Sequence, residues 1–111
     1  MGKLIFVSSP YTHKDKEVVN KRYEDVSKYA GKLVSEGQTA FSPITYGHVL
    51  CSFQDMPTDF EFWQDFCISF LSKCETLHVL KLEGWEESVG VEAEIAYAVE
   101  NNIEVIYVDF E

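Results

Sequence analysis

The chain has 111 residues, of which 46% are hydrophobic, and its 9 basic and 19 acidic side chains give a formal net charge of −10. One hydrophobic core fits this length, so we expect a single domain over residues 1–111, and the acidic charge excludes a basic surface for a nucleic-acid polymer. No apolar run approaches the ~20 residues of a membrane span, and three scattered cysteines with no signal-like start predict a cytoplasmic protein.

Strands and helices are predicted to alternate in the first half of the chain. Residues 3–8 (KLIFVS) are a short apolar run that predicts a buried strand. Apolar residues recur at helical spacing over 15–36, and Gly37 is typical of a helix end. Residues 39–41 predict a second, short strand. We expect residues 42–57 to form a long loop, which in a small domain often carries function.

The second half continues the alternation. Thr58 and Glu61 have the spacing of a capping box, which predicts that a second helix begins there. Residues 76–80 (TLHVL) predict a third strand, 88–101 a third helix and 103–108 (IEVIYV) a fourth strand. This alternation predicts an α/β fold, with a small flavodoxin-like or Rossmann-like parallel sheet of four to five strands and helices on both faces.

The predicted fold indicates where a ligand binds. In such sheets the ligand lies at the carboxyl ends of the strands, where the strand order reverses. For a flavodoxin-like order that point lies between the first and third strands. We therefore expect the functional site between the loops at 8–15 and 83–88.

The start of the predicted third helix combines several features. Ser88 is typical of an N-cap, and Gly90 leaves the backbone of the first turn open to a ligand such as phosphate. At about 100° per residue, Glu94 lies on the side that leans toward the sheet, whereas Glu92 and Glu100 mark the solvent face. Glu94 either escapes to solvent, pairs with a neighbour or is a functional carboxylate.

Short motifs occupy the strand ends and helix starts. They are Ser8-Ser9-Pro10-Tyr11, Ser42-Pro43-Ile44 followed by His48, Trp63 in the second helix, and residues 84–94 (GWEESVGVEAE). Together they resemble the nucleoside 2-deoxyribosyltransferase superfamily over nearly the whole chain, and most closely a small bacterial and phage branch similar to nucleoside 5′-monophosphate N-glycosidases. The most specific element is serine, one residue, glycine, three residues, glutamate, which here is Ser88, Gly90 and Glu94.

The resemblance implies hydrolysis of the N-glycosidic bond of a (deoxy)nucleoside 5′-monophosphate, with no cofactor. Glu94 would be the nucleophile, and Ser9, Ser88 and Gly90 would hold the phosphate. A carboxylate suits this chemistry because bond cleavage develops positive charge at C1′, which the carboxylate stabilises or attacks. The alternatives are base exchange by a nucleoside 2-deoxyribosyltransferase and a non-catalytic nucleotide-binding module.

Two positions depart from the pattern that the resemblance implies. The aspartate that would protonate the leaving base is replaced by Cys67, and the nearby Asp65 is about 200° away around the helix. Asp65 therefore substitutes for the missing acid only if the register changes. The tyrosine that many relatives carry in the first strand is also absent, and we expect Tyr11 to replace it in orienting Glu94.

The remaining candidates carry weaker signals. His48, in the predicted loop, either contacts or protonates the base or is simply solvated, and Trp85 either stacks on the base or belongs to the core. His78 lies inside an apolar strand and is interpreted as a buried structural residue. The histidines and cysteines lack paired ligand spacing, so we predict no metal site.

The second predicted helix bears on the oligomeric state. It carries more large apolar residues than one buried stripe needs, namely Phe60, Phe62, Trp63, Phe66 and Phe70. The resemblance further implies that sites are often completed across a dimer interface. We therefore expect a homo-oligomer built from dimers.

Overall fold

The sheet is parallel throughout the part of the chain that the computed structural model describes, residues 3–110. Its four strands lie in the order β2-β1-β3-β4, and every neighbouring pair is parallel. Their bounds are Leu4–Ser8 for β1, Thr39–Phe41 for β2, Thr76–Leu80 for β3 and Glu104–Val108 for β4. The order reverses between β1 and β3, as the sequence predicts.

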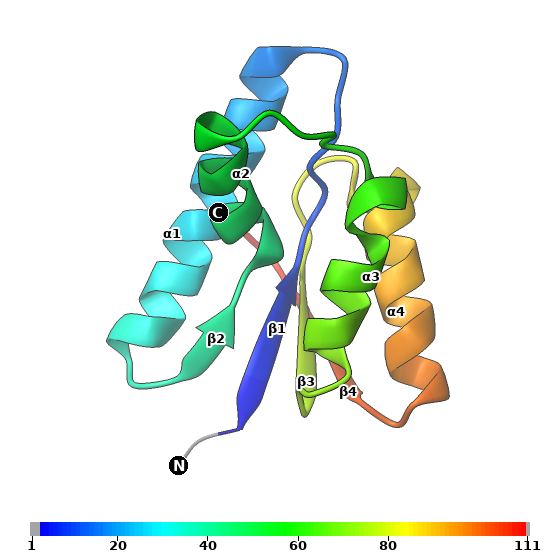
Figure 1. Cartoon of the computed structure of the whole chain (residues 1–111). Coiled ribbons are helices and arrows are strands. Elements are labelled where there is room, and N and C mark those ends of the chain that lie inside the picture. The colour runs from blue at the N-terminus through cyan, green and yellow to red at the C-terminus, as the bar shows by residue number, and fades with distance from the viewer. Residues whose placement is uncertain (1–2, 111) are drawn as a thin grey trace.

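Helices cover both faces of the sheet (Figure 1), which confirms the predicted fold class. The pair α1 (Lys16–Ser35) and α2 (Pro43–Phe53) lies on one side, and the pair α3 (Phe60–Leu71) and α4 (Val89–Glu100) on the other. A single 3-10 turn, η1 (Trp85–Glu87), precedes α4. Within the described residues, no helix is both long and apolar enough to cross a membrane.

Strand alternation divides the core into two layers. Ile5 and Val7 of β1 pack with residues of α1, whereas Phe6 packs with α3 and α4. Because side chains alternate along a strand, Ser8 lies on the same face as Phe6 and points toward α4. The last residue of the first strand is therefore directed at the helix that carries Glu94.

The prediction of a loop over 42–57 is wrong, because most of this segment forms α2. The Ser42 hydroxyl accepts a hydrogen bond of 3.1 Å from the backbone N–H of Thr45, and Pro43 stands in the first turn. Serine followed by proline is a favoured helix start, since the cap satisfies a free N–H and proline loses no hydrogen bond there. Gly47 lies within this helix, and the ring of Trp63 packs against it. A Cβ at Gly47 would lie only 3.2 Å from that ring.

The predicted capping box is also wrong. Helix α3 begins at Phe60 after Asp59, and no side chain makes a capping hydrogen bond there. Thr58 and Glu61 line a pocket instead of bonding to each other's backbone. The start of α4 matches its prediction, because Ser88 is the N-cap and its hydroxyl accepts from the N–H of Val91 at 3.3 Å.

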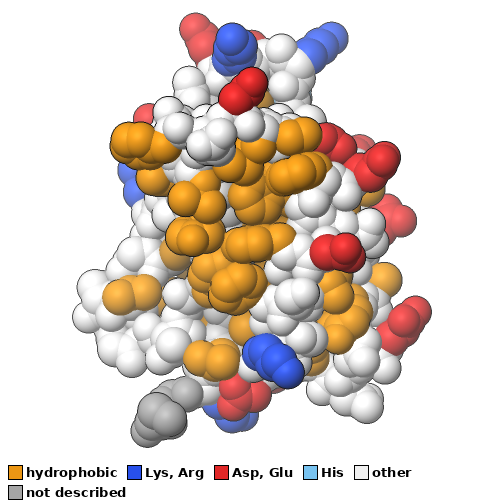
Figure 2. Space-filling model, viewed as in Figure 1, with side chains coloured by type: hydrophobic (Ala, Val, Ile, Leu, Met, Phe, Trp, Pro, Cys, Tyr) orange, Lys and Arg blue, Asp and Glu red, His pale blue; other side chains and the backbone are white. Residues whose placement is uncertain are grey.

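Aromatic side chains form an exposed face over α2 and α3. Its members are Tyr46, Phe62, Phe66 and Phe70, which we call the aromatic face. Tyr46 stacks on Phe66 with ring centres 5.9 Å apart, and Phe66 contacts Phe70 at 4.9 Å. Phe62 is 51% exposed, and Figure 2 shows hydrophobic side chains gathered on this side of the molecule.

Candidate active site

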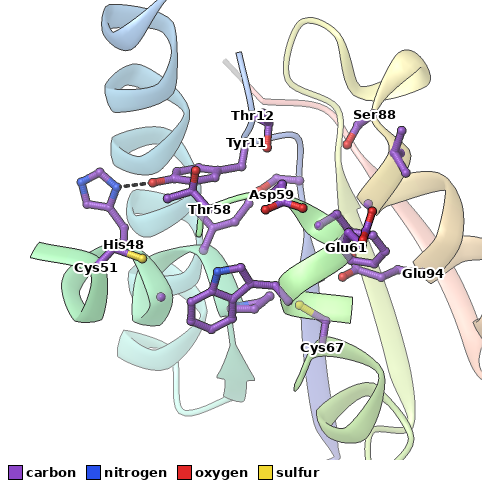
Figure 3. Close-up of a pocket in the computed structure, with 18 of the residues that line it drawn as sticks. Tyr11, Thr12, His48, Cys51, Thr58, Asp59, Glu61, Cys67, Ser88 and Glu94 are labelled. Carbon is purple, nitrogen blue, oxygen red and sulfur yellow. Dashed lines mark hydrogen bonds between the residues drawn. The ribbon is translucent and has the colours of Figure 1, made fainter. Parts of the chain in front are cut away.

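A pocket of about 460 Å³ opens at the carboxyl ends of β1 and β3, where the strand order reverses. The loop after β1, helix α2 and the first turns of α3 and α4 form its walls. Figure 3 shows Tyr11 and His48 on one side of this pocket and Glu61 and Glu94 on the other. Six of the eight predicted site residues line it, namely Ser9, Tyr11, His48, Ser88, Gly90 and Glu94.

Glu94 is buried at the inner end of the pocket, with only 4% of its surface exposed. This position confirms that the residue leans toward the sheet. The Ser8 hydroxyl donates a hydrogen bond of 2.6 Å to Oε1 of Glu94. The carboxyl group of Glu94 is therefore held by a residue of β1, while its backbone belongs to α4.

The protonation of Glu94 is balanced near neutral pH. Burial raises its pKa from the ordinary 4.5 to about 7, while hydrogen bonds from Ser8 and Cys67 oppose this rise. Removal from water disfavours the charged form, and donors directed at the oxygens favour it. The carboxyl group is thus able to hold or release a proton at physiological pH.

Cys67 lies in α3 beside Glu94 and is 5% exposed. Burial, followed by the charge of Glu94 and the hydrogen bond to it, raises the pKa of the Cys67 thiol well above its usual range. The thiol therefore stays protonated and donates to Glu94. Such a group is a poor acid for a departing base, and it is not an activated thiolate.

Two predicted site residues lie outside the pocket. Asp65 is exposed on α3, where it does not line the pocket, because two residues along a helix place it on the far side from Cys67. Trp85 packs against Tyr107, with ring centres 5.7 Å apart. The structure therefore does not bring Asp65 to the pocket, and for Trp85 it favours the alternative of a core residue.

Tyr11 does not orient Glu94, contrary to the prediction. Its hydroxyl forms a hydrogen bond of 2.7 Å with Nδ1 of His48, on the side of the pocket away from Glu94 (Figure 3). The ring of His48 also stacks on Tyr23, with centres 3.8 Å apart and planes 18° from parallel. Burial raises the pKa of Tyr11, with smaller contributions from Cys51 and Tyr23. Ser8 occupies the role expected of Tyr11, and strand alternation is the signal that could have identified it.

His78 is half-buried rather than buried. The Tyr29 hydroxyl bonds its Nδ1 at 2.7 Å, and burial lowers the pKa of the imidazole, against a smaller opposing effect of Glu104. The predicted structural role agrees with this placement on the α1 side, away from the pocket.

The expected phosphate-binding residues differ in what they offer. The Ser9 hydroxyl is buried, lines the pocket and has no hydrogen-bond partner among the described residues. The Ser88 oxygen already caps α4. Gly90 packs closely against Phe60, because a Cβ there would lie 3.1 Å from its ring. Ser9 and the first turn of α4 therefore remain the free donors at this end of the pocket.

The pocket is acidic. Asp59, Glu61 and Glu87 line it together with Glu94, and no lysine or arginine is among its described lining residues. The sequence reasoning missed these three carboxylates, because they lie at the starts of helices or in η1, where acidic residues are common for local reasons.

Arg22 holds together the two loops predicted to flank the site. Its guanidinium donates to the backbone oxygens of Thr12 and Glu83, at 3.0 Å each. Gly84 has a φ of +90°, and a Cβ there would lie 2.5 Å from Nη2 of Arg22. The glycine thus allows the close approach that ties the loop after β1 to the loop after β3.

Comparison with known families assigns the chain. A family described as "Domain of unknown function (DUF1937)" matches residues 3–109. The chain belongs to this family. A search of curated proteins finds no match. Membership in DUF1937 carries no activity with it, so the function is argued from the pocket.

Proposed function

We propose that this DUF1937 protein cleaves the N-glycosidic bond of a nucleoside 5′-monophosphate, with Glu94 as the nucleophile. The observation that carries the proposal is the buried Glu94 carboxyl group at the inner end of a pocket, held by Ser8 at the reversal of strand order. The motif resemblance to nucleotide N-glycosidases supports the same reaction.

The reaction runs in two steps. An oxygen of ionised Glu94 bonds to C1′ of the sugar while the bond from C1′ to the base breaks, and its electron pair leaves with the base. Water then attacks C1′, loses a proton and releases Glu94. The hydrogen bonds from Ser8 and Cys67 hold the carboxyl group in place for this attack.

The phosphate would lie against the first turn of α4. Backbone N–H groups at a helix start attract an anion, and the unpartnered Ser9 hydroxyl supplies a further donor. A second candidate function, base exchange on unphosphorylated nucleosides, is supported by the pocket carboxylates Asp59, Glu61 and Glu87, which repel a phosphate. The third alternative, a non-catalytic nucleotide-binding module, is supported by Cys67, which replaces the aspartate expected to protonate the leaving base.

The active form is proposed to be a homo-oligomer built from dimers. The aromatic face beside the pocket supports this, since contiguous exposed aromatic surface marks an interaction site.

To test this function, the purified protein is incubated with a panel of nucleosides and nucleoside 5′-monophosphates, and the release of free base is measured by chromatography. Release from the monophosphates is expected, and Glu94→Gln should lower it about 1,000-fold. Glu92→Gln, on the exposed side of the same helix, is the matched control. Base release that survives Glu94→Gln would remove Glu94 from the mechanism, and new nucleoside formed with an added base would favour the transferase.

A further inference from the structure

The charges around the pocket are all of one sign. Asp59 and Glu61 at the start of α3, Glu87 in η1 and Glu94 in α4 bring carboxylates from three elements to one cavity. A cleft lined by one charge sign raises the local concentration of ligands of the opposite sign. The field of this pocket therefore favours a cation and opposes an anion.

The walls suit a flat organic cation rather than a metal ion. Tyr11, Phe60 and Trp63 present aromatic side chains to the cavity, and a cation over an aromatic face is stabilised by the ring quadrupole. Among the described residues, no three side chains of the metal-ligating types converge to hold a metal ion. The carboxylates are thus spread around an extended ligand.

A second, independent observation also points to a ligand in this cavity. The Ser9 hydroxyl is about nine-tenths buried, lines the pocket and lacks a partner among residues 3–110. A buried hydroxyl without a partner loses the hydrogen bonds that water would supply. A polar group of the ligand, either the phosphate of the proposed substrate or a sugar hydroxyl, would supply the missing partner.

No acidic side chain stands at the position that the resemblance gives to the proton donor for a departing base. Cys67 stands where the resemblance implies an acid, and its thiol is held protonated toward Glu94. Asp65 lies outside the cavity. Tyr11 and His48 bond to each other on the side of the pocket away from Glu94, and the His48 ring stacks on Tyr23. A neutral purine or pyrimidine leaves as an anion unless it is protonated, which makes it a poor leaving group here.

We propose that the substrate is an N-glycoside whose leaving base carries a fixed positive charge, such as a pyridinium or an N-alkylated purine. This inference rests on the proposed glycosidase function and names its substrate class. When the bond from C1′ to the cationic nitrogen breaks, the electron pair neutralises that nitrogen, so the base departs without a proton. Water supplies the hydroxyl group that ends on C1′, and its remaining proton is released to solvent.

The test compares nicotinamide riboside, as the pyridinium probe, with uridine and inosine, each with and without a 5′-phosphate. For each compound, kcat/KM is divided by the rate of spontaneous hydrolysis, which removes the intrinsic lability of the pyridinium bond. We expect the larger ratio for the pyridinium compounds. Asp59→Asn combined with Glu61→Gln should lower kcat/KM for the pyridinium probe about tenfold, whereas Glu92→Gln changes the net charge by one unit outside the pocket and should not.

A second variant tests the missing acid. Cys67→Asp should raise kcat/KM for uridine and inosine by about 100-fold, the size of a general-acid contribution, and so reduce the preference for the cation. If this variant does not fold, the double variant Asp59→Asn with Glu61→Gln still tests the cationic substrate.

The outcomes separate this inference from the function on which it rests. One contrary result is a larger ratio of kcat/KM to the spontaneous rate for the neutral compounds, with an activity that Glu94→Gln abolishes. It would overturn the proposal of a cationic substrate but leave the glycosidase function in place. An unchanged kcat/KM for the pyridinium probe in Asp59→Asn with Glu61→Gln would also overturn it. Failure of every compound to release base would overturn both.

Discussion

The Ser8 hydroxyl and the Glu94 carboxyl group, 86 residues apart in the chain, share a hydrogen bond of 2.6 Å. This contact joins the last residue of β1 to the second turn of α4. It stabilises the charged form of a group that burial would otherwise keep protonated. The same contact therefore links the packing of α4 on β1 to the charge state of the carboxyl group in the pocket.

Glu94→Gln should stabilise the protein at alkaline pH. The unfolded chain ionises Glu94 near pH 4.5, whereas the folded chain does so near pH 7, so the free energy of unfolding falls as pH rises between these values. The loss is complete above about pH 7 and amounts to about 3 kcal/mol. Urea unfolding of the variant and the natural protein at pH 5 and pH 8 measures it.

The variant should be more stable at pH 8, and the difference should shrink toward pH 5. Glu92→Gln serves as the control because Glu92 is exposed on the same helix. An equal difference at both pH values would show that Glu94 does not carry the buried charge.

Ser8→Ala should weaken the charged form of Glu94. Loss of the donor moves the pKa of Glu94 upward, so the pH midpoint of activity rises. The substitution should cost about 1–3 kcal/mol of stability at pH 8, where the carboxylate needs its partner, and less at pH 5. A pH–rate profile and urea unfolding measure the two effects. Ser8→Thr, which keeps the hydroxyl, should restore the profile, and an unchanged midpoint in Ser8→Ala would contradict the role given to Ser8.

Substitution by alanine should change the free energy of unfolding in opposite directions at Gly84 and at Gly31. Gly84 has a φ of +90°, which strains any residue with a side chain, so Gly84→Ala should destabilise by about 1–3 kcal/mol. Gly31 lies inside α1 with no neighbour within 4 Å of a built Cβ. Gly31→Ala should therefore stabilise by about 0.5–1 kcal/mol. Urea unfolding compares the two variants, and equal effects would contradict the backbone strain expected at Gly84.

The fold was predictable because its signals are local. Short apolar runs marked the four strands, and helical spacing marked α1 and α4, including the cap at Ser88. Helix α2 was missed because Ser42-Pro43-Ile44 was interpreted as the start of a loop. The structure explains this, since Ser42 is the N-cap of α2 and Pro43 stands in its first turn.

The site was predictable only where one helix decides the direction of a side chain. The rotation per residue was enough to direct Glu94 toward the sheet. The partner of Glu94 is a contact between segments far apart in the chain, so Tyr11 was chosen where the structure has Ser8. The acidic lining was invisible for the same reason, because Asp59 and Glu87 meet only when the two helix starts come together around the pocket.

The aromatic face should form the interface of a dimer. Phe62, half exposed on α3, lies in this face, so Phe62→Lys would place a charge where the second copy packs. Light scattering at micromolar concentration should give twice the chain mass for the natural protein and the mass of one chain for Phe62→Lys. Val99→Lys is the control, because Val99 is 66% exposed on α4 and outside the aromatic face. A natural protein with the mass of one chain, or a dimer that Phe62→Lys leaves intact, would contradict this interface.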